Sequence, residues 1–353
     1  MIDVLLLAVA FVVIIAGAEL FTNGIEWFGR KLDFGEGAVG SVFAAIGTAL
    51  PETIIPVIAI LFGSGAQSHE VGVGAVLGAP FMLGTLAFAV TGIVVVTSAQ
   101  HRKSGETVIV RAEVVGHDVR TFVLAYGAAI AMALLPRDLL IARALGAVLL
   151  VVAYGWHVRR HLGAEAEEDP ETPRPLRFHR FEVHPHRLNP HDPRIRIVVA
   201  QLLAAVALVV IGATLFVGAV ESIGSHLGID ATILALLVAP IATELPEAVN
   251  AVIWIRRDKD TLAIGNITGA LVFQATIPTA IALVFAPETW VIDAASLPVF
   301  ASALVAFISV LLIAIPMIRR GRLTGRALLG GGVLYVAYVV AIVAIVARSS
   351  GAS

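Results

Sequence analysis

The 353-residue chain is 58% hydrophobic and only 14% charged, and its mean hydropathy of +0.93 is far from that of a soluble globular protein. A formal net charge of −2 gives no reason to expect a nucleic acid as a partner. The sequence has no cysteine, which excludes disulfides and thiolate metal sites. The composition therefore predicts a polytopic membrane protein.

Apolar segments of roughly 20 residues, the length that crosses about 30 Å of hydrocarbon, follow one another along the chain. There are ten of them: about 3–23, 37–62, 71–97, 118–135, 138–157, 195–219, 230–255, 261–286, 293–317 and 326–347. We therefore expect an all-α polytopic membrane protein with ten transmembrane helices.

The basic residues indicate how these segments are oriented. Of the 24 Lys and Arg residues, 21 fall in alternate connections, and only Arg137, Arg143 and Arg348 fall on the other side. By the positive-inside rule, the 21 face the cytoplasm and both termini lie outside. We expect the protein to be integral to a prokaryotic plasma membrane.

Two stretches of the chain are related by duplication. Residues 17–52 align without a gap on residues 212–247, with 13 of 36 positions identical, and both stretches end in T-x-L-P-E. Five spans per repeat is an odd number, so the second repeat enters the membrane inverted, as in many secondary transporters. The predicted domains are a first membrane repeat (1–158), a cytoplasmic linker rich in His, Arg and Pro (159–194) and a second, inverted repeat (195–353).

The linker carries many polar residues and too few apolar ones to build a core, so little regular structure is expected there. Six histidines lie in or next to it, and sensing of metal or pH is the alternative role that they suggest. They are His157, His161, His179, His184, His186 and His191. A solvated linker with mixed charges is the favoured interpretation.

The T-x-L-P-E motif places a proline and a glutamate within an apolar segment, and both are costly in lipid. Pro51 and Pro246 remove a backbone N–H and kink the helix, which frees a carbonyl oxygen four residues earlier. The candidate ion-binding residues are Gly47, Thr48 and Glu52 in the first repeat, and Ala242, Thr243 and Glu247 in the second. Carboxylate, hydroxyl and carbonyl oxygens suit a hard cation such as Ca²⁺, with Glu52 and Glu247 as metal ligands. The alternative is a pair of kinked helices whose glutamates make internal polar contacts.

Further polar residues lie near these motifs or on other spans. Asn266 and Gln274 add neutral oxygens on the eighth span, and Glu19 lies deep in the first span. Glu26 and Glu221 are equivalent in the two repeats, and an entry route or a helix cap suits them better than direct ion binding.

These motifs resemble those of the calcium/cation antiporter superfamily, which contains the sodium/calcium exchangers. That family carries G-T-S-L-P-E on its second and seventh spans and G-N-x-x-G-S-N-x-F-N/D on its third and eighth, in ten helices with inverted repeats. The resemblance implies that Glu52 and Glu247 match its central Ca²⁺-binding glutamates. It also implies that Thr48 and Thr243 bind through backbone carbonyls and that Gln274 occupies the last Asn/Asp position.

The chain departs from the family pattern at neutral polar positions. Ala49 and Glu244 replace serines of the two L-P-E motifs, Ala79 and Ala270 replace serines on the partner spans, and Leu83 replaces an asparagine. The family uses those lost oxygens largely for Na⁺. The three neighbouring acids, Glu52, Glu244 and Glu247, repel one another, and this repulsion favours the binding of a proton by at least one of them.

Glu244 has an alternative orientation, in which it turns away from the site to pair with Asn250 or water.

The sequence predicts a secondary antiporter that exchanges Ca²⁺, or a related cation, for Na⁺ or H⁺ by alternating access. Its expected partners are the lipid bilayer and inorganic cations, and no cofactor is expected. A proton-coupled exchanger of monovalent cations is one alternative, and a passive cation channel with uncoupled flux is another. The sequence lacks the motifs of metalloproteases, P-loop ATPases and α/β-hydrolases, so we do not expect an enzyme.

Overall fold

The computed structural model describes residues 2–31, 52–63, 65–162, 175–181, 193–229, 231–294 and 296–350. Its α-helices are α1 (Ile2–Lys31), α4 (Ala66–Met82), α5 (Phe88–Thr97), α6 (Ala112–Met132), α7 (Leu140–Leu162), α8 (Ile195–Leu227), α9 (Ala231–Thr243), α10 (Leu245–Arg256), α11 (Asp260–Phe285), α12 (Leu297–Arg320) and α13 (Gly325–Ser350). Short 3₁₀ or π turns are η2 (Ile58–Phe62), η3 (Leu83–Ala87), η4 (Ala99–His101) and η5 (Arg177–Phe181), and the strands are β1 (Thr107–Ile109) and β2 (Arg322–Thr324).

Every one of the ten predicted spans overlaps a helix. Within the described ranges, seven helices are long and apolar enough to cross a membrane, and α4, η3 and α5 form one of them, Ala66–Thr97. Shorter apolar helices cover Glu52–Phe62 and Thr232–Ile241. The helical class is therefore confirmed, whereas the count of ten spans in two repeats stays a prediction.

The two short strands were not expected from the sequence. β1 follows α5 and β2 precedes α13, and they pair antiparallel with Val108 opposite Leu323. The pairing ties the loop after the Ala66–Thr97 helix to the connection between α12 and α13.

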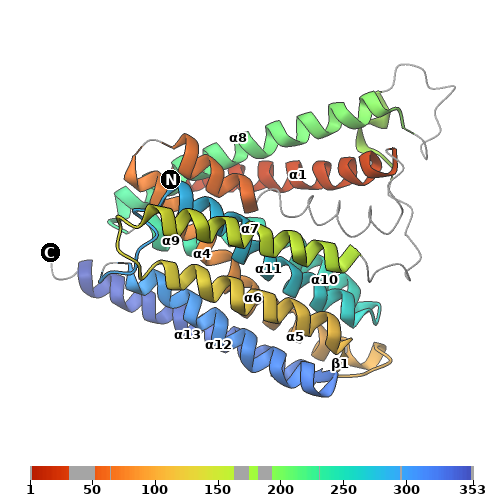
Figure 1. Cartoon of the computed structure of the whole chain (residues 1–353). Helices are drawn as coiled ribbons and strands as arrows, with labels where there is room; N and C mark the ends of the chain where they lie inside the picture. Colours follow the sequence, from red (N-terminus) through yellow and green to blue (C-terminus); the bar gives the residue numbers. More distant parts are fainter. Residues whose placement is uncertain are drawn as a thin grey trace.

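Helices α1 and α8 lie side by side along one side of the helix bundle (Figure 1). A Cβ built on Gly17 would lie 2.7 Å from the Val209 side chain, and one built on Gly212 would lie 2.7 Å from that of Ile14. The later residue of α1, Gly17, thus meets the earlier residue of α8, Val209, and Ile14 meets Gly212, so the two helices run antiparallel. At the offset of 195 of the repeat alignment, Gly17 corresponds to Gly212 and Ile14 to Val209. The alignment therefore converts one contact into the other.

The other helices also pack in two comparable sets. Helix α11 packs against α6 and α7, while α4 packs against α12, and α5 against α13. Helix α4 also packs along α9, which ends at the candidate ion site. This places α4 and α11 in the interior of the bundle, where most of their side chains are buried.

One stretch of the predicted linker (159–194) is ordered, against expectation. Residues 175–181 form η5 and its approach, and Leu176 is fully buried against α1 and α8. Two backbone N–H groups of this stretch donate to Asn23 Oδ1 at 3.0 Å and to Gln201 Oε1 at 2.9 Å. The prediction of little regular structure did not indicate this turn, which forms because α1 and α8 supply an apolar surface and hydrogen-bond acceptors.

Helix α4 approaches the backbone of α9 closely at Gly78. A Cβ built there would lie 2.2 Å from the Leu236 carbonyl oxygen of α9 and 2.8 Å from Pro240. We expect Gly78→Ala to lower the thermal denaturation midpoint in detergent, because the backbones must separate at a cost of roughly 1–3 kcal/mol.

The matched control is Gly218→Ala, at an exposed glycine of α8 with no neighbour within 4 Å among the described residues. Alanine is the better helix former, so this change should leave the midpoint the same or slightly higher. Equal midpoints for the two variants would contradict the close approach at Gly78.

Candidate ion-binding site

The second T-x-L-P-E motif interrupts a helix. Helix α9 ends at Thr243, Glu244 is the residue before α10, and Pro246 lies in the first turn of α10. Proline is accommodated there because a first-turn N–H has no partner within the helix. The predicted kink is thus a full break, which turns the short segment Thr243–Glu244 toward the interior of the bundle, where both side chains are buried.

Glu52, from the first T-x-L-P-E motif, lies in the same place. The Gln274 amide of α11 donates one hydrogen bond to Glu52 Oε2 and another to Glu244 Oε1 at 3.3 Å. The Thr243 hydroxyl also donates to Glu244 Oε1, at 3.1 Å. All four side chains are at most 4% exposed. We call Glu52, Thr243, Glu244 and Gln274 the central polar cluster.

The chemistry of this cluster suits a cation. Two buried carboxylates share a single amide group as donor, and a hydroxyl adds a neutral oxygen. Negative charges this close repel one another in the protein interior, so a bound cation or proton between them lowers the free energy. Oxygen ligands of this kind are those that Ca²⁺ prefers.

The remaining predicted site residues fall into two groups. Gly47 and Thr48 lie outside the described residues, and for Ala242, Glu247 and Asn250 the structure describes the helix but not the side chain. Glu247 lies in α10 one turn after Glu244, so its backbone is next to the central polar cluster.

The accessory carboxylates lie away from the central polar cluster. Glu19 is exposed and accepts a hydrogen bond from Arg177, and Glu221 accepts one from Ser68. Glu26 is half-buried in α1, and Asn266 is half-buried in α11.

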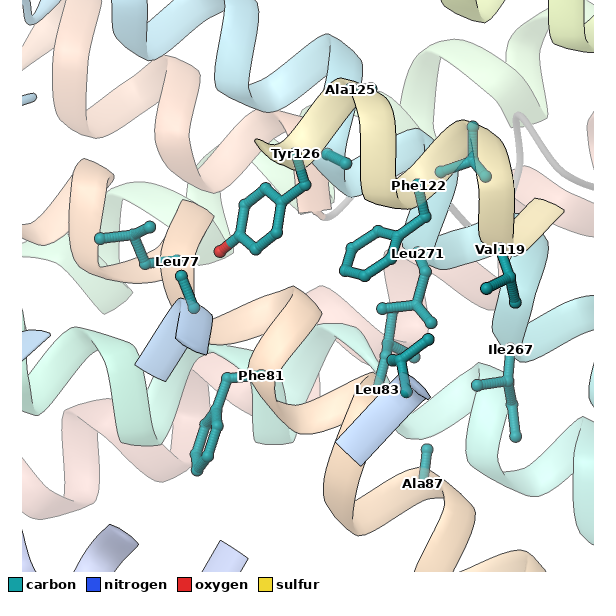
Figure 2. Packing of buried hydrophobic residues seen from close by; sticks show 14 of the residues in the cluster. Leu77, Phe81, Leu83, Ala87, Val119, Phe122, Ala125, Tyr126, Ile267 and Leu271 are labelled. Carbon is teal, nitrogen blue, oxygen red and sulfur yellow. The ribbon is translucent and has the colours of Figure 1, made fainter. Parts of the chain in front are cut away.

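Two positions at which the family pattern has an oxygen-bearing side chain are occupied here by Leu83 and Ala79, and both are packed into apolar surroundings. Figure 2 shows Leu83 beside Leu271 and Phe122, in a cluster of buried hydrophobic side chains. Leu83 is fully buried, and Ala79, one turn earlier, is 3% exposed. This part of the Ala66–Thr97 helix therefore offers no side-chain oxygen at those two positions.

Sequence reasoning missed a second group of buried polar residues. Asp118 of α6 and His157 of α7 are 1% and 6% exposed, and their Oδ1 and Nε2 atoms are 3.8 Å apart. Both residues occupy the ends of predicted spans, where charged side chains usually reach water. His157 belongs to α7 rather than to the linker.

Two solved structures share this fold. The chain aligns with the crystal structure of the H⁺/Ca²⁺ exchanger CAX with a TM-score of 0.70 and 14% identity, over 97% of this chain and 82% of that one. A structure of the sodium-calcium exchanger NCX_Mj aligns with a TM-score of 0.57 and 17% identity, over 96% of this chain and 98% of that one. At these identities the likeness concerns the fold.

A curated relative shares part of the sequence. The putative antiporter CaxA of Alkalimonas amylolytica is 34% identical over 95 residues, which is 27% of this chain and 29% of that protein. The matched region thus spans less than a third of the relative.

A family model covers most of the chain. The model of the sodium/calcium exchanger protein family matches residues 2–157 and 197–347, so both predicted membrane repeats are included. Together with the apolar helices, this match identifies an integral membrane protein. The chain belongs to the sodium/calcium exchanger protein family.

Proposed function

We propose that this protein is a secondary antiporter that exchanges Ca²⁺, or a related cation, for a counter-ion by alternating access. The observation that carries the proposal is the central polar cluster, in which Glu52 and Glu244 meet at one amide group, that of Gln274. These two acids come from the two T-x-L-P-E motifs, and ionisable residues buried among apolar helices mark ion pathways. The family membership and the CAX and NCX_Mj folds support the same class of function.

In this proposal Glu52 and Glu247 coordinate the cation. Backbone carbonyls at Gly47, Thr48, Ala242 and Thr243 add oxygens, and Gln274 holds the cluster together. Glu244 shares that cluster, so it is placed to offset the charge of the cation when it leaves, by taking up a proton.

H⁺ is the counter-ion that the site favours over Na⁺. Sodium needs several neutral oxygens, yet Leu83 and Ala79 present only hydrocarbon on the first-repeat side. A proton needs only a basic oxygen, and two neighbouring carboxylates supply it. A proton-coupled exchanger of monovalent cations would use the same residues and is the second candidate.

The architecture supports alternating access by inverted repeats. The antiparallel contact of α1 with α8 maps onto itself at an offset of 195 residues, as two repeats of opposite orientation require. We propose ten spans with both termini outside and the linker (159–194) in the cytoplasm of a prokaryotic cell. In this scheme α1 and α8 move past the interior helices to switch access.

The test is Ca²⁺ flux into liposomes that contain the purified protein. A pH gradient and a Na⁺ gradient are applied in turn, and protein-free liposomes serve as the blank. We expect saturable Ca²⁺ uptake driven by the pH gradient. Uptake that is uncoupled from both gradients would indicate a channel, and no uptake of Ca²⁺ would contradict Ca²⁺ as the transported cation.

A further inference from the structure

The buried pair Asp118 and His157 lies apart from the central polar cluster. Asp118 is in the second turn of α6, and His157 is in the last two turns of α7, the end that leads to the linker. The two side chains are 1% and 6% exposed, and their nearest atoms are 3.8 Å apart. Ionisable residues within membrane helices are costly and are retained chiefly on ion and proton pathways.

Helix α11 joins this pair to the central polar cluster. The Thr268 hydroxyl of α11 donates a hydrogen bond to Asp118 Oδ2 at 2.6 Å. Gln274, which binds Glu52 and Glu244, is six residues further along the same helix, a rise of about 9 Å. Along α11, the pair therefore lies between one and two turns from the cluster, on the side of the helix N-terminus at Asp260.

Tyr154 occupies the space between them. It precedes His157 by nearly one helical turn, and the centroids of the two rings are 6.4 Å apart. On its other side Tyr154 packs edge-on against Phe273, the neighbour of Gln274 in α11, with ring centroids 5.4 Å apart. The Tyr154 ring is thus placed between the His157 imidazole and Phe273, which is next to Gln274 in the sequence.

The residues around the pair suit the binding of a proton rather than of a metal ion. The His117 ring stacks on that of His157 with centroids 5.3 Å apart and planes 9° apart, so their nitrogens do not converge on one point. No group of three or more His, Asp or Glu residues in the described ranges is arranged to hold a metal ion. The third element at the pair, α11, contributes the neutral Thr268.

Other charged groups near the pair are at the surface. They are Glu113 and Arg120 on α6, and Arg159 and Arg160 on α7. Helix α12 packs against α6 through Ile318 and adds Arg319 and Arg320. All six charged side chains are exposed.

We propose that Asp118 and His157 form a proton-binding site that passes protons between the linker side of the membrane and the carboxylates of the central polar cluster. The site takes up one proton, on His157 Nε2 or on Asp118 Oδ1, and releases the same proton, so only N–H or O–H bonds form and break. Tyr154 carries it onward through its hydroxyl, accepting one proton as it gives up another. This inference rests on the proposed antiport and names the route of its counter-ion.

The experiment uses the full-length protein in liposomes, with Ca²⁺ as the transported probe. Two rates are measured: Ca²⁺ uptake driven by a pH gradient, and Ca²⁺/Ca²⁺ self-exchange, which needs no net proton transfer. The variants are Asp118→Asn and His157→Gln. The matched controls are Asp138→Asn and His226→Gln, at exposed positions remote from the pair.

We expect each test variant to lower proton-driven uptake by at least about tenfold, because a positioned proton carrier is lost. In both test variants, the uptake rate should also depend less steeply on the pH of the solution on the linker side of the membrane. Self-exchange should change by less than about twofold, as should both rates in the two controls. Retained self-exchange also establishes that the variant is folded, and if Asp118→Asn does not fold, His157→Gln carries the test.

Three results would overturn the inference and leave the antiport standing. They are unchanged proton-driven uptake in both variants, an equal loss of both rates in every folded variant, and wild-type uptake driven by Na⁺ alone. A wild-type protein that transports no cation under either gradient would instead contradict the proposed function, and this inference with it.

Discussion

Glu52→Gln should abolish coupled Ca²⁺ transport, with a loss of at least about 100-fold. A carboxylate attracts a cation at about 4 Å with on the order of 4 kcal/mol at an effective dielectric constant of about 20, and an amide has no net charge to replace that attraction. Glutamine has nearly the same shape as glutamate, and the Glu52 side chain is 4% exposed. The loss would therefore report the missing charge rather than a cavity. The measurement is the initial rate of pH-driven Ca²⁺ uptake in liposomes.

The matched control for this change is Glu106→Gln. Glu106 pairs with Arg326 through an exposed contact of 3.1 Å at the loop before β1, outside the helices. Exposed ion pairs contribute little, so uptake should stay within about twofold of the wild type. Glu52→Gln with wild-type uptake would remove Glu52 from the ion site, and the proposed mechanism would lose its central residue.

The positions of the helices follow from local features of the sequence. Apolar runs of membrane length predicted where the helices lie, and the proline of the second T-x-L-P-E motif predicted the interruption between α9 and α10. These features depend on residues within a few turns of one another, which is why the sequence reports them directly.

The contents of the central polar cluster were harder to predict. The duplicated motif placed Glu52 in a candidate site, but two orientations stood open for Glu244, toward the ion or toward Asn250. The structure turns Glu244 toward Gln274. That choice depends on how α9 and α10 are rotated at their break, and the close approach of α4 at Gly78 helps to set this rotation.

The pair Asp118 and His157 shows the limit of reading spans one at a time. Each residue is polar and lies at the end of an apolar segment, which is typical of side chains that reach water. Their burial arises only when α6, α7 and α11 pack together, with Thr268 reaching Asp118 from 150 positions away in the sequence. Without an alignment or a structure, such a contact has no local signal.

The second large effect concerns Arg102 and Asp260, a buried ion pair at the end of the bundle where β1 and β2 lie. Arg102 Nη2 donates to both carboxylate oxygens of Asp260 at 2.6 and 2.7 Å, and the Ile109 N–H also donates to Asp260 at 2.9 Å. The Arg102 side chain is fully buried and that of Asp260 is 5% exposed. The pair joins the loop after α5 to the start of α11.

We expect Asp260→Asn and Arg102→Met each to destabilise the protein by about 3–5 kcal/mol, because each removes one member of a buried ion pair. Asp258, whose Oδ1 is 3.8 Å from Arg102 Nε and whose side chain is 25% exposed, compensates the Arg102 charge only in part. The measurement is the thermal denaturation midpoint in detergent. Arg137→Met is the control, since Arg137 and Asp293 form a pair of similar length, 3.1 Å, with side chains 63% and 46% exposed. Its effect should stay below about 1 kcal/mol.

The double variant Arg102→Met/Asp260→Asn separates the two sources of this loss. It removes both charges, so the cost of an uncompensated charge disappears, and we expect a midpoint above that of at least one single variant. Recovery should be incomplete, because Arg102 also donates to the carbonyl oxygens of Gly105 and Ile255, which then lose a donor. A double variant as unstable as the sum of the single ones would mean that those carbonyl contacts, rather than the ion pair, hold this end of the bundle together.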